Sequence, residues 1–141
     1  MKKIFISSDH AGFTLKESIK VFLNKKGYKY SDLGPTNDNR VDYPDFAHEV
    51  AKRVKTNKNN VGILVCGSGM GMNITANRHK NIRAAQCFNL KSTKLSRLHN
   101  DANIITLGSR LLKKKIVMQL INVFLITKFE GGRHKKRINK I

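Results

Sequence analysis

Residues 61–66, with the sequence Val-Gly-Ile-Leu-Val-Cys, form a nearly continuous apolar run that leads directly into a Gly-rich segment. Such a run is typical of a strand that is buried on both faces. Strands of this kind belong to parallel sheets with helices on both sides rather than to antiparallel sheets with one solvated face. The run therefore predicts an inner strand of an α/β fold.

Further β-like runs alternate with helical patterns along the chain. The predicted strands are 3–7, 28–33, 61–66, 82–87 and 103–107, and the predicted helices are 11–25, one that opens at Pro44, 72–78, 91–98 and 111–129. This alternation predicts a Rossmann-like three-layer α/β/α sandwich with a five-stranded parallel sheet. A chain of 141 residues suits a single domain, 1–141, which ends in a helical tail at about 130–141.

The charge balance is extreme, because 28 Lys and Arg residues against nine Asp and Glu residues give a formal net charge of +19. A nucleic-acid-binding module is one interpretation of such a charge. However, Lys outnumbers Arg by 20 to 8, the basic residues are scattered, and there is no Trp. The chain also has no aromatic stripe like that of an RNA-recognition module. We therefore attribute the charge to compositional drift and expect no nucleic-acid partner.

The chain shows no membrane-spanning pattern, because its most apolar stretch, 116–126, is interrupted by Gln119 and Asn122. Its first residues do not form a signal peptide. Without an export signal, the two cysteines are expected to be reduced thiols. We expect a cytoplasmic protein with no membrane partner.

The segment Gly67-Ser68-Gly69-Met70-Gly71 links the buried strand to a helix, at the carboxyl end where ligands of open α/β sheets bind. Glycines let backbone N–H groups converge on an anion, although a tight structural turn is the alternative. The spacing is not that of a dinucleotide site, so no dinucleotide cofactor is expected. Cys66 adjoins this turn, where a thiol can act as a thiolate, whereas Cys87 is expected to be buried and inert.

The histidines give weaker signals. His10 and His99 lie at polar positions next to predicted strands, where acid–base groups belong in this fold. We expect His48 and His79 to be solvent-facing helix residues. No His or Cys residues have the spacing of a metal site, so no metal is predicted.

Arg133 and Arg137 are four residues apart, so on a helix they share one face and could clamp a phosphate. A solvated basic tail is the alternative interpretation. Gly131 and Gly132 precede them and can turn the tail back toward a site.

Six short segments follow one another through the chain: Ser8-Asp9-His10-Ala11-Gly12-Phe13, Asp42-Tyr43-Pro44, Cys66-Gly67-Ser68-Gly69-Met70-Gly71, Leu95-Ser96-Arg97 with His99-Asn100-Asp101, Leu107-Gly108-Ser109-Arg110, and Phe129-Glu130-Gly131-Gly132-Arg133-His134. Together they closely resemble segments of the type B ribose-5-phosphate isomerases. These belong to the sugar-phosphate isomerase family that also includes galactose-6-phosphate isomerase subunits.

This resemblance implies an aldose–ketose isomerase of the non-oxidative pentose phosphate pathway that interconverts ribose 5-phosphate and ribulose 5-phosphate without metal or cofactor. It implies a homodimer or homotetramer in which the neighbouring subunit completes each active site. By the same resemblance, Cys66 moves a proton between C2 and C1, Ser68 assists, and His99 helps to open the furanose ring. The amides of Gly67, Ser68, Gly69, Met70 and Gly71 hold the enediolate. Residues that match phosphate or sugar contacts are Asp9, His10, Tyr43, Asn100, Arg110, Arg133 and Arg137.

One position departs from a branch of the family that carries a Glu base where this chain has Met72. A thioether cannot take the proton, so Cys66 bears the role of base alone. Isomerisation of a related sugar phosphate, such as allose 6-phosphate or galactose 6-phosphate, is an alternative function. A basic nucleic-acid-binding module is the alternative of a different class.

Overall fold

The structure is a computed structural model that describes residues 2–141. Its strands are β1 (Ile4–Ser8), β2 (Tyr30–Asp32), β3 (Val61–Cys66), β4 (Ala84–Gln86) and β5 (Ile104–Gly108). Its helices are α1 (Phe13–Lys25), α2 (Tyr43–Val54), α3 (Met70–Ala76), α4 (Leu90–Asn100), α5 (Lys114–Ile126) and α6 (Arg133–Ile138). The predicted alternation of strands and helices is confirmed.

All the strands are parallel and lie in the order β2-β1-β3-β5-β4, so β3 is the central strand. The register pairs Val65 with Ser8 and with Leu107, and it pairs Cys66 with Gly108. The strands β1, β3 and β5 therefore end side by side. We call this side of the sheet the carboxyl edge, and the side where the strands begin the amino edge.

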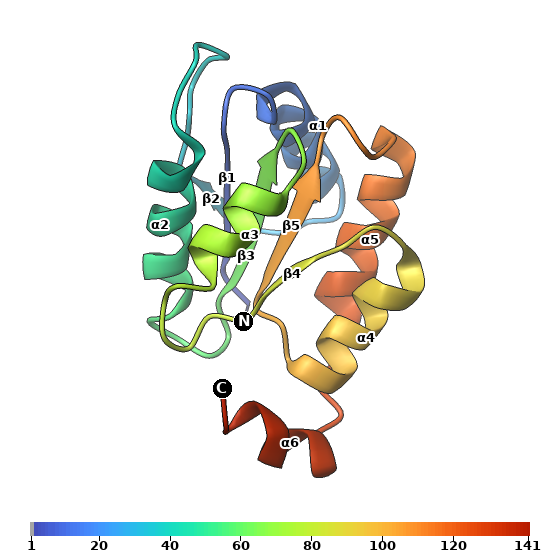
Figure 1. Ribbon diagram of the computed structural model, residues 1–141. Coiled ribbons are helices and arrows are strands. Elements are labelled where there is room, and N and C mark those ends of the chain that lie inside the picture. Colours follow the sequence, from blue (N-terminus) through green and yellow to red (C-terminus); the bar gives the residue numbers. More distant parts are fainter. Residues whose placement is uncertain (1) are drawn as a thin grey trace.

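Helices cover both faces of the sheet, which gives the three predicted layers (Figure 1). Leu64 of β3 packs into a core with α2 and α3, whereas its neighbour Ile63 packs into a second core with α1 and α5. Both side chains are completely buried. Neighbouring strand residues point to opposite faces, so an apolar residue at every position of β3 fits a layer of helices on each side.

Several elements are shorter than predicted or are shifted along the chain. The edge strand β4 covers 84–86 rather than 82–87, since it pairs only with β5. Helix α3 begins at Met70 rather than at 72, directly after Gly69, whose φ is +80°. Helix α5 covers 114–126 rather than 111–129, and no helix among the described residues is long and apolar enough to cross a membrane.

The tail lies at the amino edge, where α6 forms the lowest part of the molecule in Figure 1. Gly131 and Gly132 have φ values of +74° and +53°. They form the predicted turn, and it sets α6 against the end of α4, where the ring of His134 stacks on that of His99. The helical part of the tail, 133–138, is shorter than the predicted 130–141.

A buried lysine fixes the loop between β2 and α2, which the apolar pattern of α1 did not predict. The Lys16 side chain is completely buried, and its Nζ donates to Asp32 Oδ1 at 2.8 Å and to the Pro35 carbonyl at 2.8 Å. Burial acts to raise the pKa of Asp32, but hydrogen bonds from Lys16, Lys20 and the Gly34 N–H lower it overall. The ion pair holds the loop that leads to Tyr43 against the carboxyl edge.

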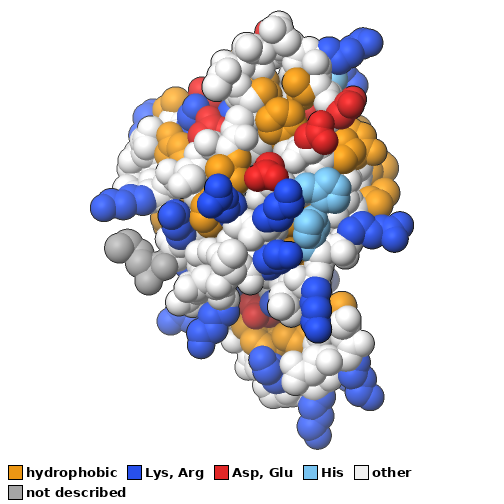
Figure 2. Space-filling view, turned by 90° about the vertical axis from the view of Figure 1, so that its left-hand side faces the viewer, with side chains coloured by type: hydrophobic (Ala, Val, Ile, Leu, Met, Phe, Trp, Pro, Cys, Tyr) orange, Lys and Arg blue, Asp and Glu red, His pale blue; other side chains and the backbone are white. Residues whose placement is uncertain are grey.

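Basic side chains are numerous on the face of the molecule that carries α2 and α3. Figure 2 views the molecule from the side of α2 and α3, where Lys and Arg side chains are spread over the face with acidic and apolar groups between them.

Candidate active site

The centre of the predicted site is the turn that follows β3. Cys66 Sγ accepts a hydrogen bond from the Gly69 N–H at 3.0 Å, and the thiol is buried. The Ser68 carbonyl accepts from Gln86 Nε2 at 2.7 Å, while Ser68 Oγ accepts from the Met70 N–H at 3.2 Å. These bonds fix both the sulfur and the loop around it.

Close packing against β5 explains the glycine at position 69. A Cβ there would lie 2.9 Å from the Leu107 carbonyl carbon, and the φ of +80° is strained for other residues. Within the described residues, the N–H groups of Gly67, Ser68 and Gly71 have no hydrogen-bond acceptor. The turn therefore presents free backbone donors next to a thiol, which is the composition of a site that stabilises an oxyanion.

Two polar side chains flank the turn. The ring of Tyr43 lies directly over Gly71, because a Cβ on that glycine would meet ring carbons at 2.5 Å. The guanidinium of Arg110 lies along Gly67, at 3.1 Å from the position of a Cβ there. The Arg110 N–H donates to the Gly67 carbonyl at 3.0 Å, so the turn after β5 is tied to the turn after β3.

The turn after β1 completes the cluster at the carboxyl edge. Asp9 is buried, and its Oδ1 accepts from the Gly12 N–H at 2.9 Å. His10 Nδ1 accepts from the Val41 N–H at 3.3 Å, which ties the turn to the loop before α2. The structure thus brings Asp9, His10, Tyr43 and Arg110 around Cys66 and its Gly-rich turn.

The remaining predicted site residues lie at the amino edge of the same chain. His99 and Asn100 end α4, just before β5 begins at Ile104. Arg133 and Arg137 share the exposed face of α6, which contacts α4. Because Ile104 pairs with Gly62 whereas Gly108 pairs with Cys66, this group is separated from Cys66 by the length of the strands. The Gly131-Gly132 turn does not return the tail to Cys66 of its own chain.

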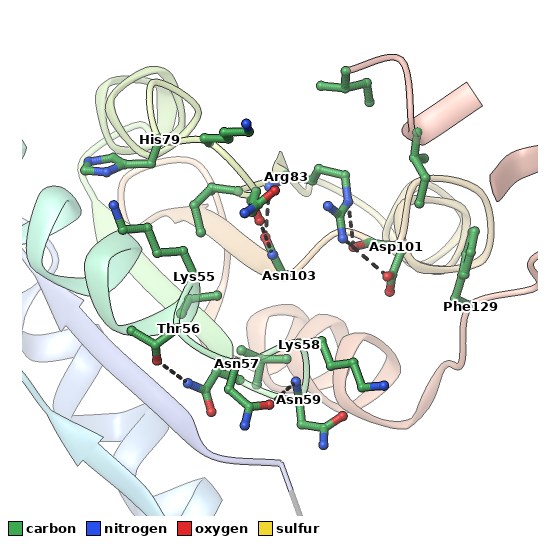
Figure 3. A pocket seen from close by; sticks show the side chains of 18 of the residues that line it. Lys55, Thr56, Asn57, Lys58, Asn59, His79, Arg83, Asp101, Asn103 and Phe129 are labelled. Carbon is green, nitrogen blue, oxygen red and sulfur yellow. Dashed lines mark hydrogen bonds and ion pairs between the residues drawn. The ribbon is translucent and has the colours of Figure 1, made fainter. Parts of the chain in front are cut away.

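A cavity of about 1120 Å³ also lies at the amino edge, between the loop that precedes β3 and the segments around Arg83 and Asp101 (Figure 3). Lysine and asparagine side chains dominate its lining. Its one acidic lining residue, Asp101, is paired with both Arg83 and Arg97. It contains none of the predicted site residues, and no sequence pattern predicted it.

Two expectations about single residues have different outcomes. Cys87 is buried as predicted, and burial raises the pKa of its thiol, which favours the unreactive protonated form. His48 lies on helix α2 as expected, but the expectation that both histidines are solvent-facing helix residues is wrong. His79 lies in the turn after α3, and its Nε2 is 2.7 Å from His48 Nδ1, because the packing of α2 against α3 brings the two rings together.

Three residues near the site were not assigned by the sequence. Gln86 anchors the Gly-rich turn, but a short edge strand gave no signal for that contact. Glu130 and His134 lie close to His99, with Glu130 Oε2 at 3.9 Å from His99 Nε2. Both residues lie in the same short segment as Arg133, and this proximity in the sequence could have assigned them to the site.

Comparison with known proteins agrees with this geometry. The family model described as Ribose/Galactose Isomerase matches residues 4–141. Ribose-5-phosphate isomerase B of Escherichia coli is 40% identical over 100% of this chain and 95% of its own. The crystal structure of a ribose 5-phosphate isomerase from Thermotoga maritima is 46% identical, with a TM-score of 0.95 over 98% of this chain and 95% of that one.

A further relative was solved with a sugar phosphate. It is ribose-5-phosphate isomerase B of Mycoplasma genitalium with bound ribulose-5-phosphate, which is 43% identical, with a TM-score of 0.95 over 99% of this chain and 93% of that one. A family match over nearly the whole chain, together with relatives above 40% identity, leaves no ambiguity of membership. The chain belongs to the ribose/galactose isomerase family.

Proposed function

We propose that this protein is an aldose–ketose isomerase that interconverts ribose 5-phosphate and ribulose 5-phosphate. The observation that carries the proposal is Cys66 Sγ, held 3.0 Å from the Gly69 N–H beside a turn with free backbone donors. The type B isomerases among its relatives, one with ribulose-5-phosphate bound, supply the substrate. We expect it to act in the non-oxidative pentose phosphate pathway in the cytoplasm.

The reaction needs one base and one oxyanion site. The Cys66 thiolate removes the proton from C2 of the open-chain aldose, and the electron pair moves to the carbonyl oxygen at C1, which gives an enediolate. The hydroxyl proton on the C2 oxygen passes to the C1 oxygen, and the same thiol returns its proton to C1 as the C2 oxygen becomes the carbonyl. The N–H groups of Gly67, Ser68 and Gly71 face the charge that develops on oxygen. One such donor contributes about 2.7–4 kcal/mol in measured cases.

Cys66 acts as the only base of the Gly-rich segment. Met72, at the position where a branch of the family carries a Glu, is completely buried in the core formed with α2. Its thioether has no proton to exchange and contacts apolar side chains. Ser68 Oγ, held by the Met70 N–H, lies on the same turn and assists by donating to a substrate oxygen.

We infer that two copies of the chain combine to form each active site. Ring opening needs an acid–base group near the sugar, and His99 is the residue to which the family resemblance gives that role. Within one chain His99 and Cys66 lie at opposite edges of the sheet. In a two-fold dimer, each chain can give its amino edge to the carboxyl edge of the other, so both sites are completed at once.

Exposed apolar side chains near the carboxyl edge support such a dimer. Met70 and Ile74 on α3 are 51% and 63% exposed, and Phe88, which follows the edge strand β4, is 48% exposed. Large exposed apolar groups close to one another mark interaction surfaces. A partner seated there would bring its His99, Asn100, Arg133 and Arg137 to this Cys66.

In the assembled site, charged groups from both chains recognise the substrate. Arg133 and Arg137, one turn apart on α6, provide two guanidinium groups for the phosphate, and His10 provides a third polar contact. Asp9, Tyr43, Asn100 and Arg110 contact the sugar hydroxyls or the phosphate.

The direct test is conversion of ribose 5-phosphate to ribulose 5-phosphate by the purified protein in the presence of a chelator. Allose 6-phosphate and galactose 6-phosphate are assayed in parallel. We expect turnover that survives the chelator and is fastest with the five-carbon substrate. No turnover with any of the three would overturn the proposal, and faster turnover of a six-carbon phosphate would replace its substrate.

The role of His99 has its own test. His99→Asn is expected to slow ring opening far more than exchange of the C1 or C2 proton with solvent, measured as isolated steps. Equal losses in the two steps would reject ring opening as its role.

A further inference from the structure

His99, Glu130 and His134 form a cluster of three potential metal ligands at the amino edge. One donor atom from each residue lies within 4.8 Å of those of the other two. His99 Nε2 and Glu130 Oε2 are 3.9 Å apart, and the rings of His99 and His134 stack with centroids 4.2 Å apart. Two imidazoles and a carboxylate are a ligand set that binds Zn²⁺ with one coordination position left open.

The backbone fixes the three residues relative to one another. The Glu130 N–H donates to the Leu98 carbonyl at 3.1 Å, which ties the segment before α6 to the end of α4. The His134 N–H donates to the Gly131 carbonyl at 3.1 Å across the glycine turn. A ligand set on a fixed backbone loses less conformational entropy when it closes on a metal.

His134 has a buried polar atom with no partner. The residue is 5% exposed, and its Nε2 has no hydrogen bond within the described residues. A buried ring nitrogen in this state is costly unless something binds the ring.

The donors need only a local adjustment to close on a zinc ion. Zn²⁺ binds nitrogen at about 2.0–2.1 Å in a tetrahedron, so its donors lie roughly 3.4 Å apart. The widest present separation within the cluster is up to 4.8 Å. The side chains of His99 and Glu130 are 37% and 54% exposed, so they have room to rotate. The lone pairs of an imidazole lie in the plane of its ring, so two stacked rings cannot both point a nitrogen at one ion. Rotation of His99 separates the two rings and lets both nitrogens face the metal.

We propose that His99, Glu130 and His134 bind Zn²⁺ and that this binding inhibits the enzyme by withdrawing His99 from ring opening. The inhibition rests on the proposed function, whereas the metal site does not. The positive charge of the neighbouring Arg133 repels a bound cation, and the negative charge of the Glu130 carboxylate offsets this repulsion. The site is therefore expected to be weaker than a closed structural zinc site.

The binding test uses the whole chain and competition for Zn²⁺ with a chromophoric indicator, so it needs no catalysis. Loss of an outer-shell partner already weakens metal binding by about 10–100-fold, so removal of a direct ligand should cost at least about tenfold. We expect that loss in both Glu130→Gln and His134→Asn. His79→Asn is the matched control, because it removes one ring of the other close histidine pair. It should leave Zn²⁺ affinity unchanged.

The Cys66 thiol could bind Zn²⁺ in place of the proposed cluster. The Cys66→Ala variant is therefore titrated with Zn²⁺ as well, and it should retain its affinity for zinc. Loss of binding in Cys66→Ala, or unchanged affinity in Glu130→Gln, would overturn the metal site. Glu130 is exposed, so its variant decides the question even if His134→Asn disturbs α6.

The activity arm measures the inhibition constant for Zn²⁺ in wild type and in Glu130→Gln, each relative to its own rate without metal. The constant should rise in the variant by the same factor as the dissociation constant. Zinc binding that depends on the three residues but leaves the rate unchanged would overturn the inhibitory half of the proposal. A chain without isomerase activity would instead refute the proposed function, while the binding arm would still decide the metal site.

Discussion

The two edges of the sheet offer a substrate very different surroundings. At the carboxyl edge, Cys66 and its Gly-rich turn are held by hydrogen bonds of 2.7–3.2 Å, with Tyr43 and Arg110 packed against the glycines. At the amino edge, a cavity of about 1120 Å³ is lined mainly by lysine and asparagine. Among the described residues that line this cavity, no thiol or other nucleophile lies beside a turn with free backbone donors. We therefore place the proposed catalytic centre by the fixed arrangement of its chemical groups rather than by the volume of a cavity.

Under the proposed function, neither edge is sufficient alone. The carboxyl edge has Cys66 and the free backbone donors of its turn, while the amino edge has His99 and the two tail arginines. The proposed function assigns proton transfer to one chain, and phosphate binding with ring opening to the amino edge of another. Variants at each edge should therefore fail in different ways.

The largest effect is expected at Cys66. Cys66→Ala should lower kcat by about 10²–10⁴-fold, which is the usual contribution of a positioned acid–base group. Circular dichroism and the elution volume should match wild type. Cys87→Ala removes the other buried thiol, which belongs to the core on the opposite face of the sheet from Cys66, and should keep a nearly normal rate. Near-normal turnover by folded Cys66→Ala would remove the carboxyl edge as the place of proton transfer.

The tail arginines come next. Arg133→Ala or Arg137→Ala should weaken binding of the phosphorylated sugar by about one to two decades, since a charged hydrogen bond contributes roughly 1.5–3 kcal/mol. Unphosphorylated ribose should be affected less. Lys135→Ala and Lys136→Ala, on the same short helix, are the controls and should change KM little. Equal losses in all four variants would mean that the tail acts only as diffuse charge.

A smaller effect is expected where Tyr43 covers Gly71. Gly71→Ala places a methyl group 2.5 Å from ring carbons, and overpacking of this kind costs about 1–3 kcal/mol. The ring is 41% exposed and can move, so we expect the lower end of that range in urea unfolding. In a Tyr43→Ala background the same substitution should cost almost nothing. Equal costs in the two backgrounds would show that the ring does not cover this glycine.

The smallest effect concerns pH and the amino edge. Burial, and then the nearby His48, lowers the pKa of His79. Below the ordinary histidine pKa of about 6.5, the unfolded chain therefore takes up a proton that the folded chain resists, and stability falls as pH falls. Above that pH the group makes no difference. His79→Gln should lose less stability than wild type between pH 7 and 5, with an unchanged isomerase rate at pH 7.5. Parallel stability curves would contradict this.

Much of the carboxyl edge could be predicted from the sequence. The apolar run 61–66 is the only one of its kind, and it coincides with β3 at both ends. A strand buried on both faces fixes the layers, and the residues after it must lie at the carboxyl edge. Contacts made by single polar side chains could not be predicted, because Lys16 looks like any solvated helix residue until Asp32 lies opposite it.

The direction of the chain explains why the predicted site residues lie at two opposite edges of the sheet. This separation could have been predicted from the sequence. A residue just before a parallel strand lies at the amino edge, and His99 precedes β5. The tail follows α5, which runs back from the carboxyl edge, so α6 also begins at the amino edge. The stacking of His99 on His134 and the pairing of His48 with His79 needed the packed helices.

Mixing two inactive variants tests the shared site most directly. Cys66→Ala and His99→Asn are each purified, combined in equal amounts, allowed to exchange subunits and assayed with ribose 5-phosphate. If each site joins Cys66 of one chain to His99 of the other, every mixed dimer has one intact site. Random exchange should then restore about a quarter of the wild-type rate per chain. A mixture that exchanges subunits, as shown by mass spectrometry, but stays as inactive as its components would contradict a site built from both edges.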